Sequence, residues 1–594
     1  MCGINGILNF KLNLSSHILE KSISLMNNTI SHRGPDNDSF YKSTDNKFIL
    51  GNRRLAIIDR DKKSDQPLIS QYTNNIISFN GEIYNYLSLK NLLIEKGYKF
   101  KTKGDSEVAL YLYDEFGINF LSQLDGMFAI SIWDFKIESL FLVRDLFGKK
   151  PIYYLNTNNN FFFSSEIAAI KKANTKEFTS YNNNNFLEFI DFGYVNHNNT
   201  IFKNIFKLEP SSYLQINKDK IVTNKYDYFS NNISNSNLEY EHLLDSAVSK
   251  RMIADRKLGI LLSGGVDSTL ITNSAIKNNF DVSTFTINIL DKKNYQYIDV
   301  INKINKKNEI SNNIKNISSH ELLNDVDKIY TNLSEPLTDI SVIPTYLAYQ
   351  FASDTCKVLL NGDGADEIFH GYRRHILSKF ISVVGLKQNS FLEKIMNYSE
   401  IRLLRSLFAN DLTKLQHLSG NYFSYSDNSL FLYNNRDRLE ASIDNKSFNF
   451  HHKMLFHDST NQLTNCLLLK SDHCSMVNSV EARSPFLDKF IYKKSLNDNI
   501  DFNSLIKTKI ILRNILAKSN KVAANLPKEG FDLKKNFIYK NNKLKIIEII
   551  SSSNSYIFNF IDKKKLINNF YNNINFNSDI YWLVYSFIIW EENT

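Results

Sequence analysis

A glycine-rich loop between a short apolar run and a helical pattern restricts the fold of this chain more than any other feature. Residues 258–262 predict a buried strand, Ser-Gly-Gly-Val-Asp-Ser follows at 263–268, and a helix comes next. Further strand-like runs at 282–289 and 357–360 are separated by helical segments. This alternation is typical of βαβ units, which build a parallel sheet. We therefore expect a parallel-sheet α/β domain here, with mainly helical structure after residue 375.

The loop has the chemistry of an anion site. Gly264 and Gly265 permit a tight turn that brings backbone N–H groups near an anion, and the following helix begins with unpaired donors. Ser263 and Ser268 can donate hydrogen bonds to phosphate oxygens. Asp267 would repel phosphate unless a cation lay between them, which indicates Mg²⁺. A glycine pair is often only a turn, but the complete string between strand and helix favours phosphate binding.

A second acidic loop follows the strand-like run at 357–360. Its sequence is Asn-Gly-Asp-Gly-Ala-Asp-Glu, from Asn361 to Glu367. Ligands of a parallel sheet bind at the carboxyl ends of its strands, so both loops are expected to face one crevice. Carboxylates beside a phosphate site favour a metal, with Asp267 and Asp366 as its ligands. The alternative is a capping cluster for the next helix.

The N-terminal part of the chain has a different pattern. Short β-rich runs alternate with turn signals, and helix-like segments near 17–31 and 87–96 interrupt them. This pattern predicts layered sheets covered by helices. A chain of 594 residues is too long for a single core. We expect domains at 2–210 and 238–594, joined by a polar linker at 211–237.

Charge and cysteine content argue against several classes of protein. The 71 Lys and Arg residues exceed the 62 Asp and Glu residues, but the resulting formal charge of +9 is spread along the chain. No clustered basic patch indicates nucleic-acid binding. Four cysteines do not make a disulfide framework, and no apolar run reaches the ~18 residues that span a bilayer. Because the N-terminus lacks a secretory pattern, we expect a cytoplasmic protein that binds neither nucleic acid nor membrane.

Cys2 is a candidate nucleophile. If Met1 is removed, the α-amine of Cys2, with a pKa of ~7.7–8.0, can accept the proton of its own thiol. A cysteine at position 2 is uninformative by itself, but it is followed by strings at 31–36 (SHRGPD), 53–57 (RRLAI), 79–85 (FNGEIYN), 104–107 (GDSE), 124–129 (LDGMFA), 144–145 (RD) and 147–148 (FG). Together these strings resemble the class II glutamine amidotransferase domain, which implies an N-terminal-nucleophile (Ntn) hydrolase with an αββα sandwich.

This resemblance implies a glutamine site. Asn80 and the backbone N–H of Gly81 would stabilise the negative oxygen that forms when the thiol attacks the side-chain amide. Arg54 would bind the α-carboxylate of glutamine, and Asp105, with Glu82 or its backbone, would pair with the α-ammonium. Each residue also has a simpler interpretation: a hairpin turn for the Asn-Gly pair, a helix cap for the aspartate and a surface ion pair for the arginine.

Over nearly its whole length the chain resembles the glutamine-hydrolysing asparagine synthetase family. The 263–268 loop is similar to the pyrophosphate loop of ATP pyrophosphatases, and strings at 470–476 and 481–488 resemble the helical part of the synthetase domain. The segment 527–531 is similar to the one that carries the family's catalytic lysine, here Lys528. The implied fold is adenine nucleotide alpha hydrolase-like. The implied ATP-binding residues are Leu261, Ser263, Gly264, Gly265, Asp267, Ser268, Ile287, Asn361, Gly362 and Asp363.

The implied reaction is the ATP-dependent amidation of aspartate to asparagine through β-aspartyl-AMP, with Mg²⁺ as cofactor. Glutamine hydrolysis at Cys2 would supply ammonia, and glutamate, AMP and pyrophosphate would be released. Lys528 would neutralise charge on the adenylate, and adenine would lie between Leu261 and Ile287. Two alternatives remain: a different carboxylate acceptor in a biosynthetic cluster, and a non-catalytic regulator that binds glutamine or nucleotide. The sequence leaves open whether the protein is a homodimer.

Several positions depart from the family's strings. Asn361 stands where relatives more often have serine, and His370 where glycine is common. Leu146 and Lys149 alter the last of the N-terminal strings. None of these changes removes a group that the chemistry requires. No basic residue for the α-carboxylate of aspartate is evident, and residues 335–341 are expected to border the acceptor pocket.

Overall fold

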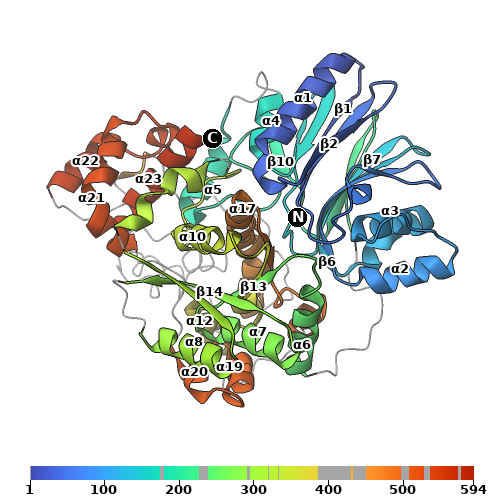
Figure 1. Ribbon diagram of the computed structural model, residues 1–594. Helices are drawn as coiled ribbons and strands as arrows, with labels where there is room; N and C mark the ends of the chain where they lie inside the picture. The colour runs from blue at the N-terminus through green and yellow to red at the C-terminus, as the bar shows by residue number, and fades with distance from the viewer. Residues whose placement is uncertain are drawn as a thin grey trace.

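Figure 1 shows the computed structural model, with N-terminal sheets in blue to cyan beside a C-terminal region in green to red. The first strand begins where these regions meet, because Arg33 contacts both the carbonyl of Cys2 and the side chain of Asp472. The structure describes residues 2–173, 180–226, 239–290, 295–318, 320–331, 333–384, 430–432, 450–496, 507–527, 535–572 and 577–594.

The N-terminal region contains two six-stranded antiparallel sheets. The first has the strand order β10 (Ile205–Lys207), β8 (Tyr153–Asn156), β9 (Asn160–Ser164), β1 (Cys2–Asn9), β3 (Phe48–Arg54), β2 (Asn37–Lys42). The second has the order β12 (Ile221–Lys225), β11 (Ser212–Ile216), β7 (Ser139–Arg144), β6 (Gly126–Asp134), β5 (Ile76–Ile83), β4 (Leu68–Ile69).

Helices cover the outer face of each sheet. Helices α1 (Ser16–Thr29) and α4 (Ile167–Ala173) share a core with the first sheet. Helices α2 (Tyr86–Glu95) and α3 (Asp105–Phe116) share one with the second. A third apolar cluster, including Ile4, Phe48, Trp133 and Phe161, lies between the sheets. Each sheet buries side chains on both of its faces, which explains the long apolar runs in these strands. The predicted αββα sandwich is confirmed.

Strands β11 and β12 lie in the stretch that was expected to begin the linker. They pair with each other and extend the second sheet beyond β7. Their side chains alternate between buried and partly exposed positions in β11 and are all partly or fully exposed in the edge strand β12. An edge strand of this kind is polar on its outer side, which is why its composition resembles that of a connection. The described part of this region ends at residue 226 and resumes at residue 239.

The C-terminal region is built on a parallel five-stranded sheet, which confirms the predicted α/β domain. Its order is β15 (Ser311–Ile317), β14 (Ser283–Ile289), β13 (Leu258–Leu261), β16 (Val358–Leu360), β17 (Glu481–Arg483). One apolar cluster joins it to α6 (Tyr240–Arg251), α7 (Val266–Lys277), α8 (Tyr295–Lys307), α18 (Lys489–Leu496), α19 (Ile510–Ala517) and α20 (Lys521–Asn525). A second joins it to α9 (Val326–Tyr330), α10 (Val342–Ser353), α17 (Leu469–Val477) and α23 (Ser578–Asn593).

The remaining helices complete the helical C-terminal part that the sequence predicted. Helix α23 is buried along most of its length, and its indole N–H groups donate to backbone carbonyls, Trp582 to Thr338 and Trp590 to Leu333. None of the described helices is long and apolar enough to cross a membrane. The other described helices are α5 (Asn183–Phe192), α11 (Ala365–Ile368), α12 (Arg373–Val384), α16 (Phe450–His457), α21 (Lys535–Ser552) and α22 (Lys563–Tyr571), with a π-helical turn at Asp458–Leu468.

Two candidate active sites and their interface

Cys2 is the first residue of β1 and is paired with Arg54 in β3. Its side chain is buried, and its backbone N–H donates to the side-chain oxygen of Asn80 at 3.0 Å. Burial raises the pKa of the Cys2 thiol above its ordinary value, which the backbone of Leu55 and the charge of Arg54 oppose. A buried thiol with a raised pKa is a weak nucleophile until a base removes its proton.

Asn80 and Gly81 lie in the middle of β5, opposite Ala129 and Phe128 in β6. This position excludes the hairpin-turn interpretation of the pair. The Nδ2 atom of Asn80 is buried and has no hydrogen-bond partner among the described residues. A side chain at Gly81 would place its Cβ 2.1 Å from the carbonyl oxygen of Met127, so the strand pairing requires glycine here. An orphaned buried amide beside a thiol is an available donor for a developing oxyanion.

The two acidic residues of the predicted glutamine site have different surroundings. Asp105 opens α3 and accepts a hydrogen bond from the backbone N–H of Ile83 at 2.9 Å, outside its own helix. Burial raises the pKa of Asp105 to about 6. Glu82 is buried too, but its carboxylate pairs with Arg483 of the C-terminal region at 3.0 Å. Of these two carboxylates, therefore, Asp105 is the one not held by an arginine.

Arg54 forms a buried ion pair, which excludes the interpretation of this arginine as part of a surface ion pair. Its Nη1 atom lies 2.7 Å from Asp65 and 3.1 Å from the carbonyl of Asp61, and Nη2 contacts the carbonyls of Ile58 and Asp59. These bonds fix the loop that follows β3 against the start of β1. Both Nη atoms already donate to two acceptors each, so a glutamine carboxylate would have to take the place of one of them, and Asp65 is the acceptor that it resembles chemically.

Of the nucleotide residues predicted from the sequence, all except Gly264 line one cavity of about 240 Å³ at the carboxyl ends of β13, β14 and β16. The loop is closed by hydrogen bonds to the Ser268 hydroxyl, from the backbone of Ser263 at 3.1 Å and with its hydroxyl at 3.0 Å. Gly264 has φ +75°, a conformation that favours glycine. The cavity is lined by Leu261, Ser263, Gly265, Asp267, Ser268, Ile287, Asn361, Gly362, Asp363 and Asp366, among others.

A lysine that sequence reasoning missed bridges the two predicted metal ligands. The ammonium of Lys509 lies 2.5 Å from Asp267 and 2.7 Å from Asp366, and all three residues line the cavity. Two carboxylates that meet one cation have oxygens aimed at a common point, and such oxygens are the donors that Mg²⁺ prefers. The two carboxylates therefore supply the kind of oxygen donor that a divalent cation requires, at a point that the Lys509 ammonium occupies in this structure. No pattern in the sequence singles out Lys509, which is distant from both loops along the chain.

A second charged pair lies at the wall of the same cavity, where its lysine and the neighbouring Ser341 are lining residues. Lys470, on α17, lies 2.7 Å from Asp339 and 2.6 Å from the Ser341 hydroxyl. Burial lowers the pKa of Lys470, but the charge of Asp339 outweighs this effect and raises the pKa above its ordinary value. Sequence analysis included Lys470 in a family string without giving it a role. The expectation that residues 335–341 border a pocket was the only signal for its partner Asp339.

Lys528 lies outside the described residues. The described chain stops at Pro527, which lines the cavity and accepts a hydrogen bond from the Tyr297 hydroxyl. Arg513 fixes this segment further through bonds to the carbonyls of Ala524 and Leu526, at 2.6 and 2.9 Å.

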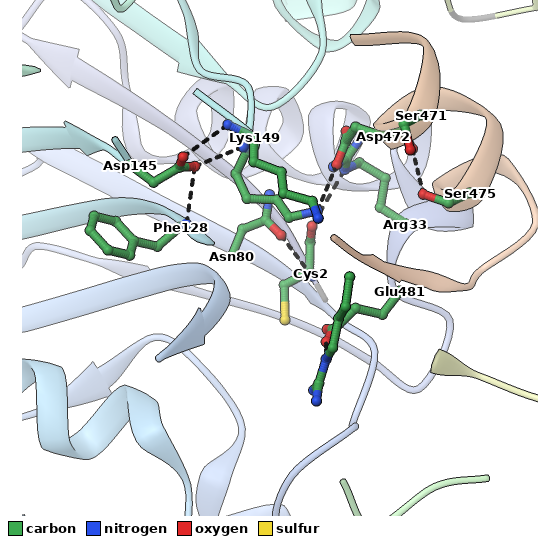
Figure 2. A network of polar contacts seen from close by, with 12 residues as sticks. Cys2, Arg33, Asn80, Phe128, Asp145, Lys149, Ser471, Asp472, Ser475 and Glu481 are labelled. Atoms are coloured by element: carbon green, nitrogen blue, oxygen red, sulfur yellow. Dashed lines mark hydrogen bonds and ion pairs between the residues drawn. The ribbon is translucent and has the colours of Figure 1, made fainter. Parts of the chain in front are cut away.

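The two sites are joined by a buried network, which Figure 2 shows from close by. Asp472 on α17 pairs with Arg33 at 2.8 Å and with Lys150 at 2.9 Å, both from the N-terminal region. Burial raises the pKa of Asp472, but these two cations outweigh this effect and lower the pKa to about 2. Because Cys2 and Asn80 lie in the same network (Figure 2), the candidate glutamine site directly borders the C-terminal region.

Known proteins share both halves of this arrangement. Residues 1–227 match a glutamine amidotransferase domain and residues 239–592 match the asparagine synthase model. Asparagine synthetase [glutamine-hydrolyzing] 1 of Bacillus subtilis is 31% identical, covering 83% of this chain and 80% of its own length. A putative asparagine synthetase [glutamine-hydrolyzing] 2 of Methanocaldococcus jannaschii is 34% identical, covering 65% of this chain and 80% of its own length.

Solved structures match less of the molecule. A glutamine phosphoribosylpyrophosphate amidotransferase from B. subtilis covers 48% of this chain and 65% of its own, at 17% identity and a TM-score of 0.29. The family matches extend over both regions and agree with the resemblance that the sequence strings indicated. The chain is therefore an enzyme of the asparagine synthase family, with a glutamine amidotransferase domain at its N-terminal end.

Proposed function

We propose that this enzyme converts aspartate to asparagine, using ATP and ammonia released from glutamine. Glutamine hydrolysis is assigned to residues 2–226 and synthesis to residues 239–594. The observation that carries the proposal is the combination of two sites in one chain. A buried thiol stands beside an unpartnered amide donor. A buried interface joins it to a cavity that contains an anion loop and a lysine paired with an aspartate.

Glutamine hydrolysis begins with the Cys2 thiol. Once Met1 has been removed, the α-amine accepts the thiol proton and the sulfur attacks the side-chain carbonyl of glutamine. Asn80 Nδ2 and the Gly81 N–H donate to the oxygen that becomes negative. Collapse forms a thioester and releases ammonia, and water then frees glutamate. Asp105 pairs with the α-ammonium of glutamine, and Arg54 binds its α-carboxylate.

The synthetase step uses the cavity. A side-chain carboxylate oxygen of aspartate attacks the α-phosphorus of ATP and pyrophosphate leaves, which gives β-aspartyl-AMP. Ammonia then attacks the acyl carbon and AMP leaves. The 263–268 loop and its helix hold the pyrophosphate, and Lys509 and Lys528 supply positive charge. A Mg²⁺ ion bound with ATP would be held by Asp267 and Asp366 and would neutralise phosphate charge.

Lys470 and Asp339 support an α-amino acid as the acceptor. Lys470 lines the cavity and pairs with Asp339 at 2.7 Å, so a cation and an anion lie side by side at the cavity wall, as the carboxylate and ammonium of a zwitterion require. Lys470 supplies the basic group that the sequence left unidentified. A carboxylate acceptor without an α-amino group would leave Asp339 with only the partners it already has.

Pyrophosphate release by the purified enzyme with ATP, Mg²⁺ and ammonium tests the acceptor. Aspartate is compared with succinate, which lacks the α-ammonium, and with β-alanine, which lacks the α-carboxylate. We expect release with aspartate alone, together with asparagine detected by mass spectrometry. Release only with some other acid would replace aspartate as the acceptor, and no release with any acid would favour a non-catalytic regulator. Intact-mass measurement checks the removal of Met1.

A further inference from the structure

Lys149 is a buried lysine that the proposed chemistry does not use. It follows β7, in a turn whose shape is set by Asp145, because the Asp145 carboxylate accepts the backbone N–H groups of Phe147, Lys149 and Lys150, each at 3.0 Å. Figure 2 shows Asp145 beside Lys149. Its side chain is 6% exposed. The Nζ atom crosses to the C-terminal region and donates to the hydroxyl of Ser484 at 2.7 Å.

This hydrogen bond starts a chain that ends in the nucleotide cavity. The Ser484 hydroxyl donates to Oδ1 of Asn361 at 2.6 Å, and Nδ2 of Asn361 donates to Asp363 at 2.7 Å. Asn361 and Asp363 both line the cavity. A serine hydroxyl has one proton to donate, so accepting from Lys149 leaves that proton for Asn361 and fixes which way the amide faces.

The chain joins two positions that depart from the family's strings. Asn361 stands where relatives more often have serine, and Lys149 alters the string that follows Asp145. An asparagine carries a separate acceptor and donor at its end, whereas a serine has only one hydroxyl. The acceptor end of Asn361 meets the Ser484 hydroxyl, which in turn meets the amine of Lys149. The structure thus brings the two unusual residues into one hydrogen-bonded unit.

The side-chain amine of Lys149 forms no ion pair with a described acidic side chain. Its neighbour Lys150 pairs with Asp472, but in the described part of the chain no carboxylate lies within ion-pair distance of the Lys149 side chain. Burial, together with the nearby charge of Lys150, lowers the pKa of Lys149 well below its ordinary value. Asp363 and Asp145 attract this amine from beyond ion-pair distance, and the direct polar contact of its Nζ atom is the hydrogen bond to Ser484.

We propose that Lys149 is a positioning residue through which the glutaminase half sets the geometry of the nucleotide cavity, acting through Ser484 on Asn361. Docking of the N-terminal region then supplies part of the ATP-binding site, although Lys149 itself does not touch the nucleotide. The proposal rests on the assignment of this cavity to ATP.

ATP binding, measured by isothermal titration calorimetry, tests the proposal without turnover. We expect Lys149→Met and Ser484→Ala each to weaken ATP binding about tenfold. The first variant leaves the Ser484 hydroxyl without its donor, and the second leaves Asn361 without its donor and Lys149 without its acceptor. The double variant should be no weaker than either single variant, because both remove the same chain. Lys250→Met is the matched control. Lys250 also crosses the interface, to Asp125 at 2.9 Å, but Asp125, unlike Ser484, makes no hydrogen bond to a cavity residue in the described part of the chain. The Lys250→Met variant should therefore bind ATP with wild-type affinity.

Kinetics separate positioning from a general loss of structure. With ammonium as nitrogen source, Lys149→Met should raise the KM for ATP while glutamine hydrolysis without ATP stays at the wild-type rate. Wild-type ATP affinity in Lys149→Met, or additive losses in the double variant, would overturn the proposal. If Lys149→Met does not fold, wild-type ATP affinity in Ser484→Ala would also overturn the proposal. A wild-type protein that binds no ATP would instead refute the assignment of the cavity.

Discussion

A buried amide donor without a partner is costly, and Asn80 keeps one beside the Cys2 backbone. The cost is offset if the donor is satisfied only when negative charge forms on a bound amide. We expect Asn80→Ala to lower kcat for glutamine hydrolysis about 10²–10³-fold with little change in KM, because the lost bond is made mainly in the transition state. Steady-state kinetics on the purified variant measure both. A rise in KM with unchanged kcat would show that Asn80 binds ground-state glutamine instead.

Asp105 gives the glutamine site a pH dependence. Burial raises its pKa to about 6, so the carboxyl is neutral below that pH and cannot pair with the α-ammonium of glutamine. We expect kcat/KM for glutamine to show an inflection near pH 6, below which protonation of Asp105 lowers it by a further tenfold or so per pH unit, in addition to the loss caused by protonation of the Cys2 α-amine. Ammonia-driven synthesis, which does not use this residue, should lack the inflection. The same inflection with either nitrogen source would assign it to another group.

At the scale of elements, the strand–loop–helix formed by β13 and α7 depends on two glycines that differ in conformation. Gly264 has φ +75°, and a Cβ there would lie 2.7 Å from the carbonyl oxygen of Tyr297. Gly265 has φ −74°, and its nearest contact would be the Ser263 hydroxyl at 3.4 Å. The backbone conformation at Gly264 requires glycine, whereas the space at Gly265 accommodates a methyl group.

This difference predicts unequal losses of stability. Gly264→Ala should lower the free energy of unfolding by about 1–3 kcal/mol, the cost of a strained left-handed residue that also meets a backbone atom. Gly265→Ala should lower it by less than about 1 kcal/mol. Denaturant unfolding of both variants and the wild type makes the comparison. Equal losses would mean that the loop relaxes around Gly264.

Helix α17 shows what one element contributes to both sites. Lys470 and Ser471 line the nucleotide cavity, and the next residue, Asp472, pairs with Arg33 and Lys150 across the interface. Successive residues on a helix point about 100° apart, so a short string can serve a cavity on one side and a docked domain on another. This explains why the string at 470–476 resembles a family signature without naming a catalytic group.

For the molecule as a whole, the interface is held by buried charges. Asp472→Asn would leave Arg33 and Lys150 without their shared anion, at a cost of about 3–5 kcal/mol. We expect faster proteolysis between the domains and more glutamate formed per asparagine. Glu115→Gln, which breaks the exposed pair with Lys96, is the control and should cost less than ~1 kcal/mol. Wild-type coupling in Asp472→Asn would contradict this role.

The same group predicts a limit at low pH. The pKa of Asp472 is about 2, below the ordinary aspartate value, so its contribution to stability is present above ~3.9 and is lost as pH falls towards about 2.

Sequence patterns predicted the layers and the nucleotide loops because both follow local rules. Apolar runs indicated the strands, and glycines at the end of β13 indicated the loop. Lys509 and the pairing of Lys470 with Asp339 could not be predicted, since each brings together residues far apart in the chain and only the tertiary fold sets their distance. Strand β11 and the edge strand β12 were taken for a linker because β12 has polar, solvent-facing side chains and both strands are short.

The division of labour between the halves is tested most directly by Cys2→Ala with ATP and aspartate, supplying either glutamine or ammonium chloride and measuring asparagine and pyrophosphate. The thiol has no part in the synthetase cavity, so the account predicts no asparagine from glutamine and wild-type synthesis from ammonium. Loss of both activities in a folded variant, or asparagine still made from glutamine, would contradict it.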